Sequence, residues 1–178
     1  ARAAAEARLP GLLDEMAAPL LAPGAAGELA RLRTDLPRAM EALALLIAKH
    51  GLTITGTEVA RETKAALGPG QDIAGTIDLL LARPDGRAAV LDMKWAGTDR
   101  YRRAEVLEGR AVQLAAYVGL VGAGEDAGFF MLAQCRVLAT DASLFGGRPA
   151  PGLPDTWQRT LLARQARLAT IGAGTLHA

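Results

Sequence analysis

The chain has 178 residues, a length that suits one domain with its own hydrophobic core. Hydrophobic residues make up 51% of it, which excludes a disordered chain. The formal net charge is +1, so no global field attracts nucleic acid, and any contact with DNA must come from a local patch. Aromatic residues make up only 4%, which predicts an aliphatic core.

Cysteine use and hydropathy narrow the setting of the protein. Cys135 is the one cysteine of the sequence, which excludes an intramolecular disulfide and a protein-only iron–sulfur cluster. It fits a reducing, cytoplasmic location. No apolar run reaches the ~18 residues that span a membrane, and no signal-peptide pattern is present, so we expect no membrane partner. The chain begins with Ala1 rather than methionine, so we expect a fragment of a longer protein.

Residues 1–51 are predicted to be helical. The expected helices are 2–22 with an interruption at Pro10 and Gly11, 26–34, and 37–49 with Pro37 in its first turn and Gly51 as its stop.

Three strands are predicted next. Residues 52–66 are rich in β-branched side chains, which favour a strand. Two apolar runs, 73–83 and 87–94, flank the turn residues Pro84, Asp85 and Gly86, which indicates a hairpin.

The remainder of the chain is predicted to form helices around one more strand. The expected elements are a polar charged loop at 96–108, a helix at 109–121, a buried strand at 127–138, a loop at 139–153, and a final helix capped by Asp155 that runs to Ile171. Together they predict a single α/β domain with a central mixed sheet of about four strands flanked by helices. Its parts would be a helical segment at 1–51, a core at 52–138, and a loop and C-terminal helix at 139–178.

Asp78, Asp92 and Lys94 carry the strongest chemical signal. The hairpin would bring the two carboxylates together, where they repel each other unless a cation lies between them. Hard oxygen ligands favour Mg²⁺ or Mn²⁺. Strand alternation places Asp92 and Lys94 on one face and Met93 on the other. Each residue alone is better explained by a turn contact or a solvated ion pair. A central strand that ends in these charges, however, indicates a metal or substrate site.

Further polar residues could belong to the same site. Gln113 and Tyr117 lie four residues apart on one face of an apolar helix, where they either bind partners or lie at the surface. Glu58, on the strand before the hairpin, could add a third carboxylate, with Glu62 as the rival candidate, and either could be a solvated glutamate. His50 ends a helix before Gly51 and is more simply explained by the helix dipole than by metal binding.

A group of cations follows Lys94. The basic residues there could hold a phosphate backbone, although neighbouring acidic residues also suit a solvated loop; they are Arg100, Arg102 and Arg103. Trp95 could stack on a base or cover the edge of the site.

The motifs together resemble the PD-(D/E)XK nuclease superfamily, and more narrowly its RecB-like members, including the C-terminal nuclease domains of AddB-type subunits. The matching segments are Gly-Thr-Ile-Asp at 75–78, Leu-Asp-Met-Lys at 91–94 and Gln-Leu-Ala-Ala-Tyr at 113–117, in the order and at the spacing of that family. The resemblance covers about residues 52–138. It implies a restriction-endonuclease-like core in which the elements follow the order αβββαβ.

The resemblance also implies roles. Asp78 and Asp92 would hold Mg²⁺ or Mn²⁺ with the Met93 carbonyl, and Lys94 would orient the attacking water and stabilise charge on the phosphate. Gln113 and Tyr117 would line the site, touch DNA or brace the catalytic loop, and Glu58 matches an acidic residue before the hairpin. The early-helix histidine and the four-cysteine iron–sulfur staple of some relatives have no counterpart in this sequence.

Two functions are therefore weighed. The first is a Mg²⁺-dependent deoxyribonuclease, exo- or endonuclease, within a helicase–nuclease that repairs DNA double-strand breaks, with DNA and a helicase domain or subunit as partners. The second is a nuclease-fold module that binds DNA or a partner subunit without cutting. The three residues Asp78, Asp92 and Lys94 favour the first function, and the missing histidine favours the second.

Overall fold

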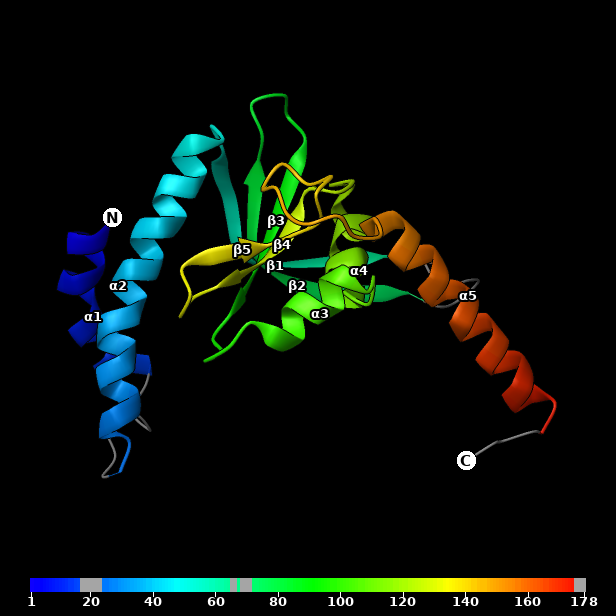
Figure 1. Ribbon diagram of the computed structural model, residues 1–178, viewed down its shortest axis with the longest axis horizontal. Helices are drawn as coiled ribbons and strands as arrows, with labels where there is room; N and C mark the ends of the chain where they lie inside the picture. The colour runs from blue at the N-terminus through cyan, green and yellow to red at the C-terminus, as the bar shows by residue number, and fades with distance from the viewer. Residues whose placement is uncertain (17–23, 65–66, 68–71, 175–178) are drawn as a thin grey trace.

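A five-stranded mixed β-sheet forms the centre of the protein, with helices on both faces (Figure 1). The computed structural model describes residues 1–16, 24–64, 67 and 72–174. The strands are β1 (Thr53–Thr63), β2 (Ile73–Ala82), β3 (Ala88–Lys94), β4 (Ala127–Met131) and β5 (Arg136–Leu138). The helices are α1 (Arg2–Met16), α2 (Ala26–Lys49), α3 (Arg100–Leu107), α4 (Val112–Val121) and α5 (Leu153–Gly172). The predicted α/β class with a mixed sheet flanked by helices is thus confirmed.

The strands lie in chain order across the sheet, β1-β2-β3-β4-β5. The pairs β1–β2, β2–β3 and β4–β5 are antiparallel, whereas β3 and β4 are parallel. Parallel neighbours need a long crossover connection, and α3 and α4 supply it here. The predicted hairpin of 73–83 and 87–94 matches β2 and β3.

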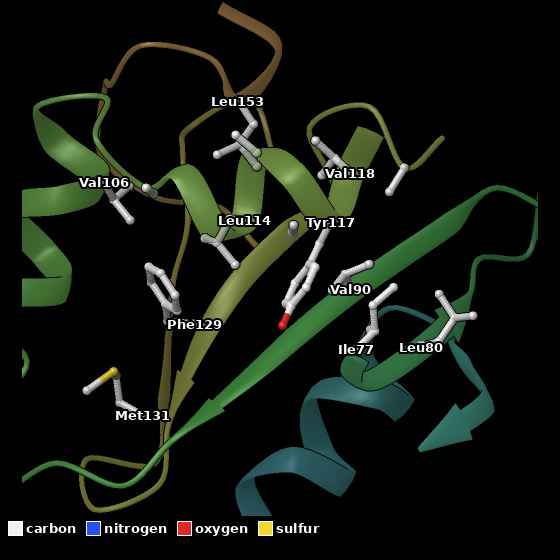
Figure 2. Packing of buried hydrophobic residues seen from close by; sticks show 14 residues of the cluster. Ile77, Leu80, Val90, Val106, Leu114, Tyr117, Val118, Phe129, Met131 and Leu153 are labelled. Atoms are coloured by element: carbon white, nitrogen blue, oxygen red, sulfur yellow. The ribbon is translucent and has the colours of Figure 1, made fainter. Parts of the chain in front are cut away.

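Two apolar layers hold the helices on the sheet. On one face, residues of α3 and α4 pack on the sheet around Phe129, as Figure 2 shows for Val106 and Leu114, and Leu153 of α5 packs against α4 in the same cluster. On the other face, Ala39 and Leu43 of α2 pack on the strands. The charged end of β3 therefore reaches the α3–α4 face, while Met93 packs in the α2 layer as alternation predicts.

Several predicted boundaries at the N-terminus are wrong. One continuous helix, α2, replaces the two expected at 26–34 and 37–49, with Pro37 inside it. Pro37 costs the helix a backbone hydrogen bond, but its ring is buried and Ala39 and Leu43 beyond it pack on the sheet, which offsets that cost. Likewise α1 continues through Pro10 without the expected interruption. Residues 17–22 of that expected helix lie outside the described part of the chain.

Two further segments differ from expectation. The charged run at 96–108 is not a loop throughout, because 100–107 form α3, whose Arg, Ala, Glu and Leu residues favour helix and whose Val106 is buried. The expected strand at 127–138 is two strands, because a turn closed by the Cys135 N–H to the Leu132 carbonyl at 3.2 Å reverses the chain. The sheet accordingly has five strands rather than about four.

The final helix begins differently from the prediction. Its N-cap is Gly152, not Asp155, which lies in the first turn. The carboxylate of Glu125, from the loop before β4, instead accepts a 2.9 Å hydrogen bond from the Leu153 N–H. A distant carboxylate therefore takes the place of the local cap, and no local sequence pattern shows it.

Candidate active site

Asp78 and Asp92 lie at the open end of the β2–β3 hairpin. The ladder between the strands runs from Ala82–Ala88 at the turn to Leu79–Leu91. One step further in this register, Asp78 is level with Asp92. There the Asp78 carboxylate accepts a 2.7 Å hydrogen bond from the Met93 N–H. A side-chain oxygen thus replaces the ladder hydrogen bond where the two strands separate, and it fixes Asp78 beside the end of β3.

Asp92 is a buried carboxylate that forms an ion pair with Lys94. Its exposed fraction is 1%, and apart from Lys94 no group of the described residues donates a hydrogen bond to its oxygens. Its charge contact is the Lys94 Nζ, 2.6 Å from Oδ2. Burial raises the pKa of Asp92, and the Asp78 charge raises it further, although Lys94 opposes both. A carboxylate held in this way would be stabilised by a cation between it and Asp78.

Two cations stand beside these carboxylates. Phe129 of β4 pairs with Asp92 in the parallel register. The Lys94 Nζ lies 5.9 Å from the Phe129 ring centroid, and the Arg102 guanidinium carbon lies 5.1 Å from it. Helix α3 therefore brings Arg102 toward the site from the segment expected to be a loop. The positive charge suits binding of an anionic substrate next to the acidic pair.

The donor set fits a hard divalent ion. The two carboxylates and the Met93 carbonyl are oxygen donors, and the unsatisfied oxygens of Asp92 are where a cation would compensate burial. Across residues 1–16, 24–64, 67 and 72–174, no three or more His, Cys, Asp or Glu side chains group as a metal site. The fit is therefore to an ion such as Mg²⁺, which is bound through one or two carboxylates and keeps several waters.

Gln113 and Tyr117 brace β2 rather than stand free on α4. The Gln113 Nε2 donates to the Tyr117 hydroxyl at 3.1 Å, and this hydroxyl donates to the Thr76 carbonyl at 2.7 Å. Tyr117 is buried, and Figure 2 shows its ring directed at the strands. A Cβ on Gly75 would lie 3.3 Å from the Tyr117 Cε1, so the glycine makes room for this ring. The Tyr117–Thr76 hydrogen bond thus joins the motif at 113–117 to the motif at 75–78, two residues before Asp78.

Glu58 lies near Asp78 along the sheet but not in a cluster of carboxylates. It falls between the pairs Thr57–Leu79 and Val59–Ile77, level with Asp78, and its side chain is exposed. Its φ of 49° breaks the regular alternation on which its predicted face depended. The rival, Glu62, is exposed and forms an ion pair with Lys64.

Of the residues predicted to contact nucleic acid, Arg102 lies beside Phe129 near the acidic pair, whereas Arg103 binds Asp99. Trp95 is 46% exposed directly after Lys94, and Arg100 is exposed at the start of α3. Arg102 faces Phe129, as described above, whereas Arg103 turns to Asp99 and donates to its Oδ2 at 2.5 Å.

His50 lies away from the candidate site. It lines a cavity with Arg83 and Pro84, at the turn end of the hairpin. Burial, with the charge of Lys49, lowers the pKa of His50.

Asp99 and Arg136 were missed by the sequence analysis. Asp99 is buried and forms ion pairs with both Arg103 and Arg136. The spacing of Asp99 and Arg103, four residues apart, is a helical signal that could have revealed α3. No local pattern could have revealed Arg136, because β5 brings it to Asp99 from 37 residues away.

One of three comparisons with known proteins identifies the family of this chain. A comparison with curated proteins gave no match. Among solved structures, one described as "Crystal structure of SSO0001" is 17% identical with a TM-score of 0.39, covering 94% of this chain and 70% of that one, and it supports no conclusion at that score. A family model for the PD-(D/E)XK nuclease superfamily matches residues 1–168, nearly the whole chain. The chain therefore belongs to the PD-(D/E)XK nuclease superfamily.

Proposed function

We propose that this chain is a metal-dependent DNA nuclease domain that hydrolyses phosphodiester bonds. The observation that carries the proposal is the buried Asp92 carboxylate beside Asp78, because the ion pair with Lys94 offsets its burial only in part. Burying such a charge is costly unless a ligand compensates it. Membership of a nuclease superfamily agrees with this chemistry.

Asp78, Asp92 and the Met93 carbonyl would hold Mg²⁺ or Mn²⁺. When bound there, the ion would polarise the phosphate and lower the pKa of a water molecule. Lys94, fixed against Asp92, would orient the attacking water and stabilise negative charge that develops on the phosphate. Tyr117 holds the backbone of β2 in place through Thr76, so Asp78 keeps its position while the substrate binds. Glu58 is retained as a candidate third acid because it lies level with Asp78 on β1.

We further propose that the domain acts within a helicase–nuclease in the repair of DNA double-strand breaks. The support is the set of three motifs at 75–78, 91–94 and 113–117, which resembles RecB-like and AddB-type nuclease domains. DNA would be the substrate, and a helicase domain or subunit the partner. None of the described helices is long and apolar enough to cross a bilayer.

A second candidate is a module that binds DNA or a partner subunit without cutting. The specific observation that favours it is the place of His50, at the hairpin turn rather than near Asp78, which leaves the early-helix histidine of some relatives without a counterpart among the described residues.

A cleavage assay separates the two functions. Linear double-stranded and single-stranded DNA are incubated with the protein and Mg²⁺ or Mn²⁺, alongside Asp92→Ala and Lys94→Ala. Asp85→Ala and Lys64→Ala, both at exposed positions, serve as controls with the same changes of charge. We expect the controls to cut like the wild type and the site variants to lose roughly 100-fold or more of the rate. Wild-type DNA binding with no cleavage would support the binding module, and equal cleavage by all five proteins would contradict the site.

A further inference from the structure

A small basic pocket lies between α3, β5 and the loop after β5. Three arginines line it, Arg103, Arg136 and Arg148, together with aliphatic residues and Gly147. Its volume is about 210 Å³. That is below the ~300–1,000 Å³ usual for small-molecule pockets, so it suits a group the size of a phosphate rather than a whole nucleoside.

The pocket keeps positive charge after its internal ion pairs are counted. Asp99 accepts from Arg103 at 2.5 Å, and the same Oδ2 accepts from Arg136. One carboxylate against three guanidiniums leaves a charge of +2. Each guanidinium has five N–H donors, so Arg103 and Arg136 retain donors beyond those that Asp99 accepts. Their side chains are 37% and 47% exposed, so a ligand can reach them from solvent.

The walls of the pocket are fixed by backbone contacts. A Cβ on Gly147 would lie 2.0 Å from the Ala139 carbonyl oxygen, so this loop packs directly on the chain that leaves β5. Next to it, Arg148 forms a β-bridge with Thr140. Asp99, in turn, holds the guanidiniums of Arg103 and Arg136 together. The backbone of Arg148 is therefore held by these contacts, and the side chains of Arg103 and Arg136 are held by Asp99.

The sheet relates this pocket to the candidate active site. Lys94 pairs with Met131 on β4, and Met131 pairs with Arg136 on β5. The three residues form one row across neighbouring strands, which places the Cα atoms of Lys94 and Arg136 roughly 10 Å apart. The Arg136 side chain reaches Asp99 at the start of α3. Arg136 therefore lies on the face of the sheet that α3 covers, the same face as Lys94 and Arg102.

We propose that the Arg103–Arg136–Arg148 pocket binds a second phosphate of the DNA strand whose scissile phosphate lies at Lys94. Arg136 lies two strands from Lys94 on the same face of the sheet, so one strand of DNA that crosses β4 and β5 can reach both places. The pocket then sets the path of the strand over β4 and β5, and Asp99 acts as a positioning residue for the two arginines. This inference rests on the proposed nuclease function and names how its substrate is held.

Binding without turnover tests the pocket separately from catalysis. Fluorescein-labelled single- and double-stranded oligonucleotides are titrated with the wild type, Arg136→Gln and Arg148→Gln in Ca²⁺, and anisotropy is followed at several KCl concentrations. Arg61→Gln, on β1 at the opposite edge of the sheet, is the matched control. We expect each pocket variant to bind several-fold more weakly and to lower the salt slope by about 0.9 on duplex DNA, whereas the control behaves like the wild type.

Cleavage supplies the second readout. With Mg²⁺, we expect both pocket variants to raise KM for long oligonucleotides and to keep the wild-type kcat. The p-nitrophenyl ester of thymidine 5′-monophosphate, too short to reach the pocket, should be cut equally by all variants that fold. Arg148→Gln keeps the test decisive if loss of Arg136 disturbs Asp99.

Four outcomes decide the proposal. Variants that bind DNA with the wild-type affinity and salt slope overturn it, as does a loss of kcat on the short ester. If inorganic phosphate raises the Tm of the wild type but not of Arg148→Gln, while DNA binding is equal, the pocket is a free-phosphate site and the proposal fails. If the variants weaken binding but the wild type never cuts, the pocket stands as a DNA site and the proposed nuclease function fails.

Discussion

The Tyr117 hydroxyl on α4 donates a 2.7 Å hydrogen bond to the Thr76 carbonyl on β2, two residues before Asp78. We expect Tyr117→Phe to lower the free energy of unfolding by about 1 kcal/mol, because the carbonyl loses a partly buried partner. The kcat for DNA cleavage should fall as well, with KM nearly unchanged, because Asp78 loses its anchored backbone. Tyr101→Phe removes the same hydroxyl from a ring that is 76% exposed and should change neither quantity.

Gly75 tests the packing beneath that hydrogen bond. A methyl group there meets Tyr117 at 3.3 Å and Leu120 at 3.6 Å, so Gly75→Ala should cost about 1 kcal/mol in urea unfolding. Gly119→Ala, on α4 with nothing within 4 Å, should instead stabilise by about 0.5–1 kcal/mol. The cost at Gly75 should shrink in a Tyr117→Leu background, because the ring that opposes the methyl is gone. Equal costs in both backgrounds would show that the two residues do not couple.

Asp92 should lower stability in the absence of metal. Asp92→Asn removes a buried charge whose burial the Lys94 ion pair offsets only in part, so we expect the metal-free Tm to rise by about 2–4 °C. The wild-type Tm should increase on addition of Mg²⁺ or Mn²⁺, and that increase should be absent in Asp92→Asn. Differential scanning calorimetry with and without EDTA measures both effects. A metal-dependent rise of the same size in both proteins would contradict ligation by Asp92.

Asp99 should give a pH-dependent contribution to stability. The hydrogen bond from Arg103, with the charge of Arg136, holds the pKa of Asp99 below its usual value. Its contribution is therefore fully present above the unfolded pKa of about 4 and is lost as the pH falls through the folded pKa. We expect Asp99→Asn to lower the free energy of unfolding by about 1 kcal/mol at pH 7, since both arginines are partly exposed.

The gap in Tm between wild type and Asp99→Asn should close as the solution is acidified below pH ~4. Asp14→Asn, at an exposed position on α1, controls for the general loss of a carboxylate and should show no gap at either pH. A gap that persists at acid pH would mean that packing, not charge, explains the loss.

Glu125 and Asp155 compete as caps of α5. The Glu125 carboxylate accepts the Leu153 N–H at 2.9 Å, whereas Asp155 lies exposed in the first turn. We expect Glu125→Ala to destabilise by about 1–2 kcal/mol and Asp155→Ala by only a few tenths. Chemical denaturation of both variants measures the difference. A larger loss for Asp155→Ala would restore the local cap expected from the sequence.

Local patterns predicted the centre of the sheet well and its surroundings poorly. Turn residues 84–86 between two apolar runs specified the β2–β3 hairpin, because both signals are local. Pro37 was expected to begin a helix, but burial of its ring and of Ala39 outweighs the lost hydrogen bond. The charged run before Val106 hid α3, since one buried apolar residue is too weak a periodic signal.

Candidate site residues show the same division. The sequence predicted that Asp92 and Lys94 share a face, which follows from strand alternation alone, and the 2.6 Å ion pair agrees with it. It could not place Glu58, because a left-handed φ of 49° breaks that alternation. It identified Gln113 and Tyr117 as a polar stripe, but their partner, the Thr76 carbonyl, belongs to a strand 41 residues earlier than Tyr117.

The sequence by itself determined the hairpin, the acidic pair and the three spaced motifs, because each depends on contacts between near neighbours or on the fixed period of a strand or helix. Only the tertiary structure decided that Asp92 is buried, that Tyr117 holds β2, and that Arg136 joins Arg103 at Asp99. The Tyr117 contact arises where α4 packs on β2, and the Asp99–Arg136 pair arises where the β3–β4 and β4–β5 pairings bring distant segments together. Burial and long-range pairing depend on all the packed elements at once, so no local pattern carries them.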